Sequence, residues 1–319
     1  MPTRSLIDRY RRAGADPPWF DPRRDHGAPF EGYYWRFSDR ASGRVAIALC
    51  GLCRQRGRRW AVLALAVHPG GRVRELIVEP ADADSQQLGV RAREAVTASD
   101  ASIRFDLGGA ATLNAELTPR SIWPRRRWGG SGVGQLLPGL PQYWHPWLLG
   151  GVAYGEATID GEKIVLDGAH AYAEKNWGRA FPERWWWGQA DAFDADETCV
   201  AFAGGPLRVR SVGLTPTLLA IRIGERLISL TPPIAWTAAT VGVGGWHLRT
   251  RSPGHSVEIE GEALASAVTL PVPTPDRMAV EPRSTQALAG RLRVVVRKRG
   301  RTLFEGESGL AGLERHIEP

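Results

Sequence analysis

The sequence predicts an all-β protein made of two antiparallel β-barrel or sandwich domains with few, short helices. Short runs of apolar, β-branched and aromatic residues follow one another from Phe30 onward, separated by Gly, Pro, Asp and Ser turns. Many short strands at this spacing are typical of barrels and sandwiches. Residues 30–35 and 181–187 each place a Phe and an acid ahead of an aromatic run, and this echo predicts two related domains.

The predicted strands follow the turn residues closely. In the first half they are 30–37, 44–52, 59–68, 74–78, 102–107 and 111–117. In the second half they are 151–159, 163–166, 185–193, 199–203, 217–223, 226–230, 246–251, 256–260, 290–296 and 301–307. Helical periodicity is confined to 6–13, 83–94 and 310–316, where we expect short helices.

We place the boundary between the domains near residues 171–180. This gives an N-terminal extension at 1–27, a first β-domain at 28–175 and a second at 176–319. The segment 119–147 has no clear period and is rich in Pro, Gly and Trp. Linkers rarely carry so many large aromatic residues, so we expect a functional loop or lid there.

The composition, with 43% hydrophobic and 24% charged residues, is that of a soluble globular protein. The net charge of +7 comes almost entirely from arginine. The basic runs 54–59, 125–127 and 291–301 lie beside predicted turns or strands and lack a nucleic-acid motif, so we expect no nucleic-acid partner. The same charge is compatible with peripheral contact with an anionic membrane.

The cysteines indicate a reducing, cytoplasmic setting. There are three, which cannot all pair, and no Cys/His grouping has zinc-site spacing, so no metal is expected. Cys50 and Cys53 end an apolar run, which favours small buried residues over a redox centre. Residues 1–12 lack the apolar core of a secretion signal, and no segment approaches eighteen apolar residues. The oligomeric state is left open.

Residues 242–245, G-V-G-G, do not predict a dinucleotide site. A predicted strand follows them, whereas a dinucleotide-binding turn opens a helix. This segment therefore indicates no dinucleotide cofactor.

Two aromatic strands each carry a carboxylate on an aromatic face, because side chains alternate along a strand. One face of 30–37 carries Glu31, Tyr33, Trp35 and Phe37, opposite Gly32, Tyr34 and Arg36. One face of 185–193 carries Trp185, Trp187, Gln189 and Asp191. Both faces are candidates for an apolar site that includes an acid.

Such a site suits the protonation of an alkene. A carboxyl group in an apolar pocket has a raised pKa and can act as a general acid at neutral pH. Aromatic rings stabilise the resulting carbocation by about 0.5–2 kcal/mol each. The candidate acids are Glu31, Glu174 and Asp191, although Lys175 would favour the charged form of Glu174 if the two lay close in space. The competing interpretation is structural: the aromatic strands form core, and residues 174–176 tie a loop.

Residues 172–178, Y-A-E-K-N-W-G, followed by F-P at 181–182, W-W-W at 185–187 and Gln189, resemble the signature of the tocopherol cyclases. F-E-G-Y-Y at 30–34 resembles that family's N-terminal element. P-Q-Y-W-H-P-W at 141–147 is similar to its loop before the next strand, and 290–311 to its last two strands. The resemblance covers nearly the whole chain, and E-K-N-W-G with F-P-x-x-W close behind is a specific motif.

The resemblance implies a pair of lipocalin-like β-domains, shared with carotenoid hydratase-like proteins and some decalin-forming cyclases. It also implies a cofactor-independent activity, in which a prenylated quinol is cyclised to a chromanol by alkene protonation and capture of the cation by the phenol oxygen. The chain departs from the family at Asp191, where Asn is frequent, and at Tyr33-Tyr34-Trp35, where Trp-Tyr-Phe is more usual. Both departures fall in the predicted pocket.

We therefore expect an intramolecular cyclase of the isomerase or lyase type that acts on a hydrophobic prenylated aromatic or terpenoid. The expected acid is Glu174 or Glu31, with Asp191 in reserve, and Lys175 and Asn176 orient the acid or the substrate oxygen. The expected substrate-binding residues are Tyr33, Trp35, Trp144, Tyr172, Trp177, Trp185, Trp187 and Gln189.

Two alternatives remain open. The same pocket could hydrate a polyene or close a ring pericyclically, because a site that protonates or folds an alkene can admit water or a second alkene. The second alternative is a lipocalin-like carrier that binds an apolar ligand and catalyses no reaction. Such a carrier would not need Glu31, Glu174 or Asp191.

Overall fold

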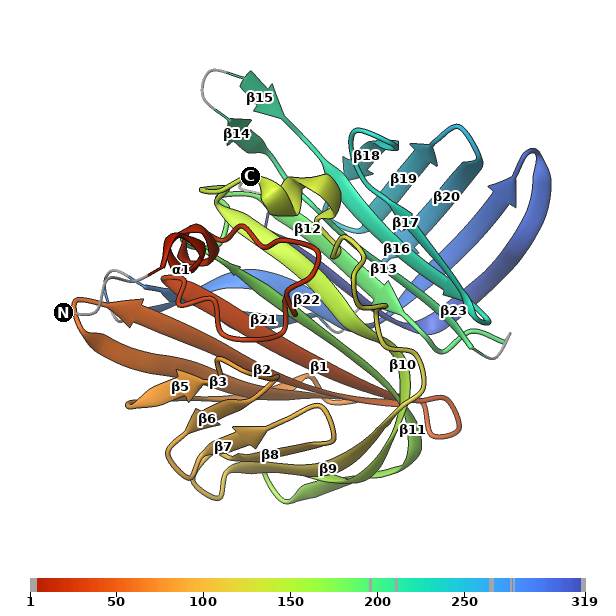
Figure 1. The fold of residues 1–319 in the computed structure, drawn as a ribbon. Coiled ribbons are helices and arrows are strands. Elements are labelled where there is room, and N and C mark those ends of the chain that lie inside the picture. The colour runs from red at the N-terminus through yellow and green to blue at the C-terminus, as the bar shows by residue number, and fades with distance from the viewer. Residues whose placement is uncertain are drawn as a thin grey trace.

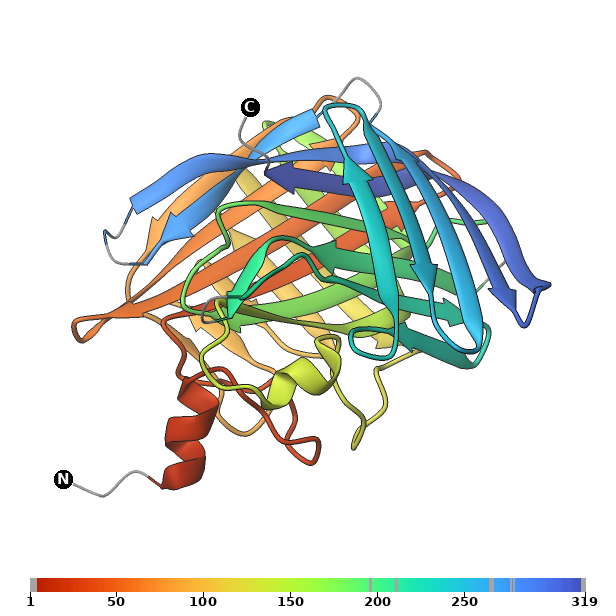
Figure 2. The ribbon, with the colours of Figure 1, turned by 90° about the horizontal axis from the view of Figure 1, so that it is seen from above.

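The computed structural model describes residues 5–194, 197–209, 212–263, 267–275, 277 and 279–316, and most of them lie in antiparallel strands (Figure 1). The predicted all-β class is confirmed. The first predicted helix is present as α1 (Leu6–Arg12), which opens with a capping box between Ser5 and Asp8. A short 3-10 helix, η1 (Gly132–Leu136), lies beside it, and Tyr10 Oη donates to the Leu136 carbonyl (Figure 2).

The other two predicted helices are wrong. In segment 83–94 the chain reverses between β5 (Ala81–Ala83) and β6 (Val90–Ala92), because the Asp84 carboxylate accepts the backbone N–H of Gln86 and closes a turn. Segment 310–316 is the end of β23 (Arg301–His316), which pairs with a strand on each side. Cross-strand pairing there overrides the local helical pattern.

The first sheet is a nearly closed barrel of eleven strands in the order β4-β3-β2-β1-β11-β10-β9-β8-β7-β6-β5. Its remaining members are β1 (Phe30–Asp39), β2 (Arg44–Gln55), β3 (Arg58–His68), β4 (Arg72–Val78), β7 (Val96–Ala98), β8 (Ser102–Asp106), β9 (Ala111–Pro119), β10 (Gln142–Ile159) and β11 (Glu162–Gly178). Its interior is filled by side chains such as Trp35, Phe37, Phe105 and Trp147.

The second sheet, also barrel-like, has the order β17-β16-β13-β12-β23-β22-β20-β19-β18, with β21 paired to β22. Its other members are β12 (Trp185–Ala190), β13 (Thr198–Gly204), β16 (Thr217–Ile223), β17 (Arg226–Leu230), β18 (Trp236–Val241), β19 (Gly245–Arg251), β20 (His255–Glu262), β21 (Ala267–Thr274) and β22 (Ala279–Lys298). A separate hairpin joins β14 (Leu207–Val209) to β15 (Val212–Leu214). Gly245 opens β19, so a strand does follow residues 242–244, as predicted.

The two sheets pack through their outer faces. A mixed apolar layer contains Tyr34, Ile47 and Tyr172 from the first sheet and Trp187 and Leu288 from the second. β21 lies against β3 and β4, and Arg36 of β1 donates Nη2 to the carbonyls of Leu288 and Leu310 at 2.6 and 2.5 Å. Figures 1 and 2 show the second sheet covering one side of the first, with the N-terminal segment at one end of this arrangement.

Residues 174–178 lie within the first sheet and not at a junction after it. β11 continues to Gly178 because each of these residues pairs with β1, from Phe30↔Gly178 to Tyr34↔Glu174. The sheets therefore divide between Gly178 and Trp185. The separation of the chain into two independently folding domains, with the predicted boundaries, stays a prediction.

Cys50, Cys53 and Cys199 are buried and form no disulfide. Burial raises the pKa of the Cys50 thiol to about 12, so it is not a reactive thiolate at neutral pH. No helix in the described part of the chain is long and apolar enough to cross a membrane.

We expect Arg36→Met to destabilise the packing of the two sheets. The substitution keeps the aliphatic stem of the side chain but leaves two carbonyls at the sheet interface without their charged donor, at a cost of about 2–4 kcal/mol. The free energy of unfolding from urea titration measures it. Arg44→Met is the matched control, because Arg44 donates to one carbonyl at an exposed site, and a loss of about 0.5 kcal/mol or less is expected. Equal losses in the two variants would contradict this assignment.

Candidate active site

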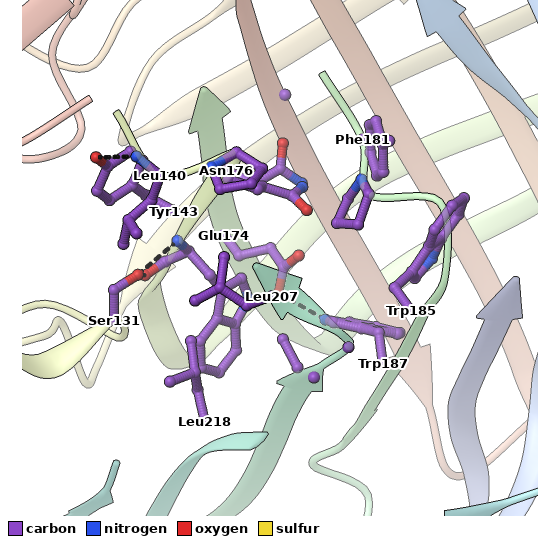
Figure 3. Close-up of a pocket in the computed structure, with 18 of the residues that line it drawn as sticks. Ser131, Leu140, Tyr143, Glu174, Asn176, Phe181, Trp185, Trp187, Leu207 and Leu218 are labelled. Carbon is purple, nitrogen blue, oxygen red and sulfur yellow. Dashed lines mark hydrogen bonds between the residues drawn. The ribbon is translucent and has the colours of Figure 1, made fainter. Parts of the chain in front are cut away.

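A cavity of about 450 Å³ lies between the two sheets. Strands β1, β2, β10 and β11 form one wall, strands of the second sheet form the other, and residues 131–141 of the Trp-rich loop also line it. The loop thus reaches the site, although its action as a lid stays a prediction. The lining is mainly apolar and aromatic and includes Trp144, Phe181, Trp185 and Trp187, together with two carboxyl groups, those of Glu174 and Glu314. Figure 3 shows Glu174 with its hydrogen bond from Trp187.

Glu174 is held by three aromatic donors. Tyr172 Oη, Trp144 Nε1 and Trp187 Nε1 all donate to its Oε2, at 2.6, 2.7 and 2.8 Å. Tyr172 and Trp144 belong to the first sheet, whereas Trp187 comes from the second. Among the described residues no donor contacts Oε1. One oxygen is therefore fixed, and the other is available to carry a proton.

Burial raises the pKa of Glu174 to about 7, against the three hydrogen bonds, which favour its ionised form. Its side chain is only 5% exposed, and Glu314 adds a smaller repulsion that also raises the pKa. A carboxyl group of this kind is substantially protonated near neutral pH. It meets the requirement of a general acid.

Asn176 faces the same cavity, two residues further along β11. Its Oδ1 is buried and has no hydrogen-bond partner among the described residues. The opposing residue on β1 is Gly32, and a Cβ added there would lie 2.2 Å from this oxygen. Glycine at position 32 therefore leaves the space that the buried amide oxygen occupies, while the Asn176 residue as a whole lines the cavity.

Glu31 and Lys175 lie on the opposite face of these strands, away from the cavity. Lys175 Nζ contacts Glu31 Oε2 at 2.6 Å, and Arg54 Nη1 contacts Glu31 Oε1 at 2.8 Å. Burial raises the pKa of Glu31, but Lys175 and Arg54 outweigh it and hold that pKa well below its usual range. Glu31 is thus ionised, and the geometry does not support it as the proton donor.

The same network anchors the N-terminal segment. Lys175 Nζ donates to the Arg24 carbonyl at 2.6 Å and lies 3.0 Å from His26 Nδ1, while His26 Nε2 lies 3.2 Å from Asp16. Trp177 stacks on His26 with ring centroids 4.2 Å apart, and its Nε1 donates to the Gly14 carbonyl. Lys175 and Trp177 therefore hold residues 14–26 at the end of the barrel and do not line the cavity.

Three further predicted substrate-binding residues are differently placed. Trp35 lies inside the first barrel. The Tyr33 ring stacks on Trp35, so Tyr33 borders the cavity while its ring packs in the barrel interior. Tyr172 reaches the site through its hydrogen bond to Glu174. Trp144, Trp185 and Trp187 line the cavity, as expected.

Gln189 and Asp191 are buried beyond the cavity lining. Gln189 Nε2 contacts Cys199 Sγ at 3.7 Å, and burial raises the pKa of Asp191. Neither side chain lines the cavity, so the geometry does not support Asp191 as the reserve acid or Gln189 as a substrate contact.

Glu314 is a cavity residue that the sequence analysis misses. It pairs with Trp187 on β12, and Trp185 Nε1 donates to its Oε1 at 2.7 Å. The sequence predicts a helix over 310–316, and for that reason it does not assign Glu314 to a strand face. In a strand, Glu314 shares a face with its cross-strand partner Trp187.

The site combines a carboxyl group with a raised pKa, an amide and several aromatic rings in an apolar space. These groups can donate a proton, form a hydrogen bond with a hydroxyl group and stabilise a cation. In the described part of the chain, no grouping of three or more His, Cys, Asp and Glu side chains could hold a metal ion.

The chain is similar to known proteins in sequence and in fold. The model of a family described as tocopherol cyclase-like matches residues 90–315. A probable chloroplastic tocopherol cyclase of Oryza sativa subsp. japonica is 28% identical over 193 residues, and a chloroplastic tocopherol cyclase of Zea mays is 28% identical over 191. Each match covers 56% of this chain and 40% of the relative, so the chain matches well under half the length of these curated proteins.

Solved structures share the fold. Kievitone hydratase from Nectria haematococca superposes with a TM-score of 0.55 and 10% identity, covering 96% of this chain and 91% of that one. A putative AttH protein from Nitrosomonas europaea superposes with a TM-score of 0.52 and 12% identity, covering 92% and 93%. At these identities the likeness concerns the double β-barrel architecture.

Glu174→Gln should change how stability depends on pH. The pKa of Glu174 rises from its ordinary 4.5 to about 7 on folding, so its contribution to stability is complete below pH 4.5 and is lost as pH rises to about 7. Relative to Glu174→Gln, we expect the wild type to lose about 3 kcal/mol across this window. Urea titrations at each pH measure the difference. Glu116→Gln, an exposed position on β9, controls for the substitution itself, and parallel curves for wild type and Glu174→Gln would contradict the raised pKa.

Proposed function

The chain belongs to the tocopherol cyclase-like family, and we propose that it closes a ring on a prenylated aromatic or related terpenoid by protonating an alkene. The curated relatives are cyclases by name, which supports an enzyme of this kind. The observation that carries the proposal is Glu174, a carboxyl group with a pKa of about 7 that faces an aromatic cavity.

In the proposed reaction, Glu174 transfers its proton to the less substituted carbon of a trisubstituted alkene. A tertiary carbocation forms at the neighbouring carbon, and the phenol oxygen of the same substrate attacks it. The new C–O bond closes the ring, and the phenol O–H bond breaks with release of its proton. Exchange with water returns a proton to Glu174, so the product has the mass of the substrate. No oxidant or reductant is consumed.

The aromatic side chains support the cationic stage. Trp144 and Trp187 are fixed by their hydrogen bonds to Glu174, so their rings lie close to the site of protonation. Tyr34 meets the Trp187 ring edge-on at 5.2 Å. Each suitably oriented ring lowers the energy of the cation by about 0.5–2 kcal/mol, or roughly one decade in rate.

Asn176 is the proposed partner of the substrate hydroxyl. Asn176 lines the cavity on the same strand face as Glu174, so its amide can form a hydrogen bond with the phenol. This arrangement would hold the nucleophilic oxygen near the alkene that is protonated, and such positioning accelerates an intramolecular reaction.

The outer part of the cavity suits an apolar tail. Val133, Leu137, Leu214 and Trp236 line it and are 37%, 52%, 42% and 57% exposed. A prenyl chain passing between them would shield apolar surface from water. Peripheral contact with an anionic membrane, and a cytoplasmic location, stay predictions from the sequence.

We expect purified protein to convert a prenylated hydroquinone, supplied in detergent under anaerobic conditions with a chelator, into a chromanol of unchanged mass. In D₂O the product should carry one carbon-bound deuterium, because the proton comes from an exchangeable carboxyl. Glu174→Gln should lower kcat by about 10²-fold or more. Liquid chromatography with mass spectrometry measures both.

Glu116→Gln serves again as the control and should retain full activity. A product heavier by one water would favour a hydratase, and ring closure without deuterium would favour a pericyclic reaction. If the wild type binds prenylated hydroquinones without converting any, and Glu174→Gln binds them equally well, the protein is a carrier and the proposal fails.

A further inference from the structure

Glu314 is the second carboxyl group that lines the cavity. It lies on β23, where it pairs with Trp187 on one side and Gln286 of β22 on the other. Trp187 in turn donates to Glu174, and Gln286 donates to Tyr34 Oη at 2.9 Å. One carboxyl group therefore projects from each sheet into a shared apolar space.

The surroundings of Glu314 do not suit a structural ion pair. The Trp185 indole fixes its Oε1, and among the described ranges no basic side chain forms an ion pair with it. The titratable or charged groups around it are Tyr34 of β1, Glu174 of β11, Arg283 of β22 and His316 of β23. Arg283 and His316 lie against the Trp185 ring, at 5.9 and 4.8 Å. A carboxyl group that lines a cavity and has no cation beside it is either neutral or, when ionised, readily accepts a proton.

The two carboxyl groups have different environments. Glu174 is 5% exposed and enclosed by three aromatic donors, whereas Glu314 is only partly buried. Burial raises the pKa of both, and their mutual repulsion disfavours the state in which both are ionised. When two nearby acids differ in burial, the deeper one retains the proton and the shallower one ionises first.

We propose that Glu314 is a second catalytic residue, which accepts the proton that the substrate hydroxyl loses while Glu174 donates its proton to the alkene. The Glu174 O–H bond, the phenol O–H bond and the π bond of the alkene break. One new C–H bond, one new C–O bond and the Glu314 O–H bond form. Proton exchange with water on product release returns Glu174 to its protonated form and Glu314 to its carboxylate.

This inference rests on the proposed cyclisation and adds a base to it. Without Glu314, the phenol attacks the cation while it still carries its proton, which slows ring closure. Alternatively, the cation loses a proton from a neighbouring carbon and no ring forms. Loss of Glu314 therefore predicts a slower reaction and a product mixture that includes ring-open alkene isomers. A merely structural role would lower the amount of folded protein without changing the products.

The test compares wild type, Glu314→Gln, Glu314→Asp and Glu307→Gln with a prenylated hydroquinone as substrate. Glu307 lies on the same strand, pairs with Arg291 at an exposed site and is the matched control. We expect Glu314→Gln to lower kcat by about 10²-fold with little change in KM, and Glu314→Asp to recover part of it. Thermal melting of each variant reports whether it is folded.

The pH profile supplies a second readout. Wild-type activity should fall at high pH, as Glu174 ionises, and at low pH, as Glu314 is protonated. Glu314→Gln should lose the low-pH limb. Its high-pH limb should move to lower pH, because removing a negative charge lowers the pKa of Glu174.

The outcomes separate the two proposals. Turnover by folded Glu314→Gln at the wild-type kcat, with the same product and pH profile, would overturn the role of Glu314 and leave the cyclase proposal standing. Absence of any cyclised product from the wild type would overturn the cyclase proposal, and this inference with it. If Glu314→Gln does not fold, the wild-type pH profile decides, since an activity that does not fall at low pH would also overturn the role.

Discussion

The pairing of β1 with β11 assigns neighbouring residues of the chain to opposite faces of one sheet. Glu174 and Asn176 project into the space between the sheets, and Lys175 and Trp177 project into the end of the first barrel. A shift of one residue in this pairing would exchange the two sets and place a lysine in the cavity. The location and the chemistry of the site both depend on this register.

The two faces of this strand pair also differ in the charged groups that surround their glutamates. On the barrel side, Glu31 is balanced by Lys175 and Arg54 and stays charged, which ties residues 14–26 to the barrel. On the cavity side, Glu174 has only neutral aromatic donors and keeps its proton to a much higher pH. Two glutamates on paired strands thus have opposite protonation states, because one has cations beside it and the other does not.

The sequence predicts the architecture better than it predicts the inward faces. The all-β class, the aromatic strands and the cavity roles of Trp185 and Trp187 follow from turn spacing and alternation. Alternation sorts a strand into two faces but does not say which of them meets the cavity. Tyr33 and Trp35 were therefore predicted to bind substrate, although the second sheet packs on the other face, that of Tyr34 and Arg36. The sequence does not predict Glu314 as a cavity residue, because its segment is a strand through pairing with β12 and β22 and not through local propensity.

The hydrogen bond from Trp187 to Glu174 joins the two halves of the chain at the reactive group itself. A chain whose second sheet has not yet docked exposes Glu174 to water, where a carboxyl group is ionised at neutral pH and cannot protonate an alkene. Under the proposed mechanism, the protonated form of Glu174 that donates to the alkene is therefore present at neutral pH only in the assembled molecule. The proposed reactivity of the chain is in this sense a late product of its own folding.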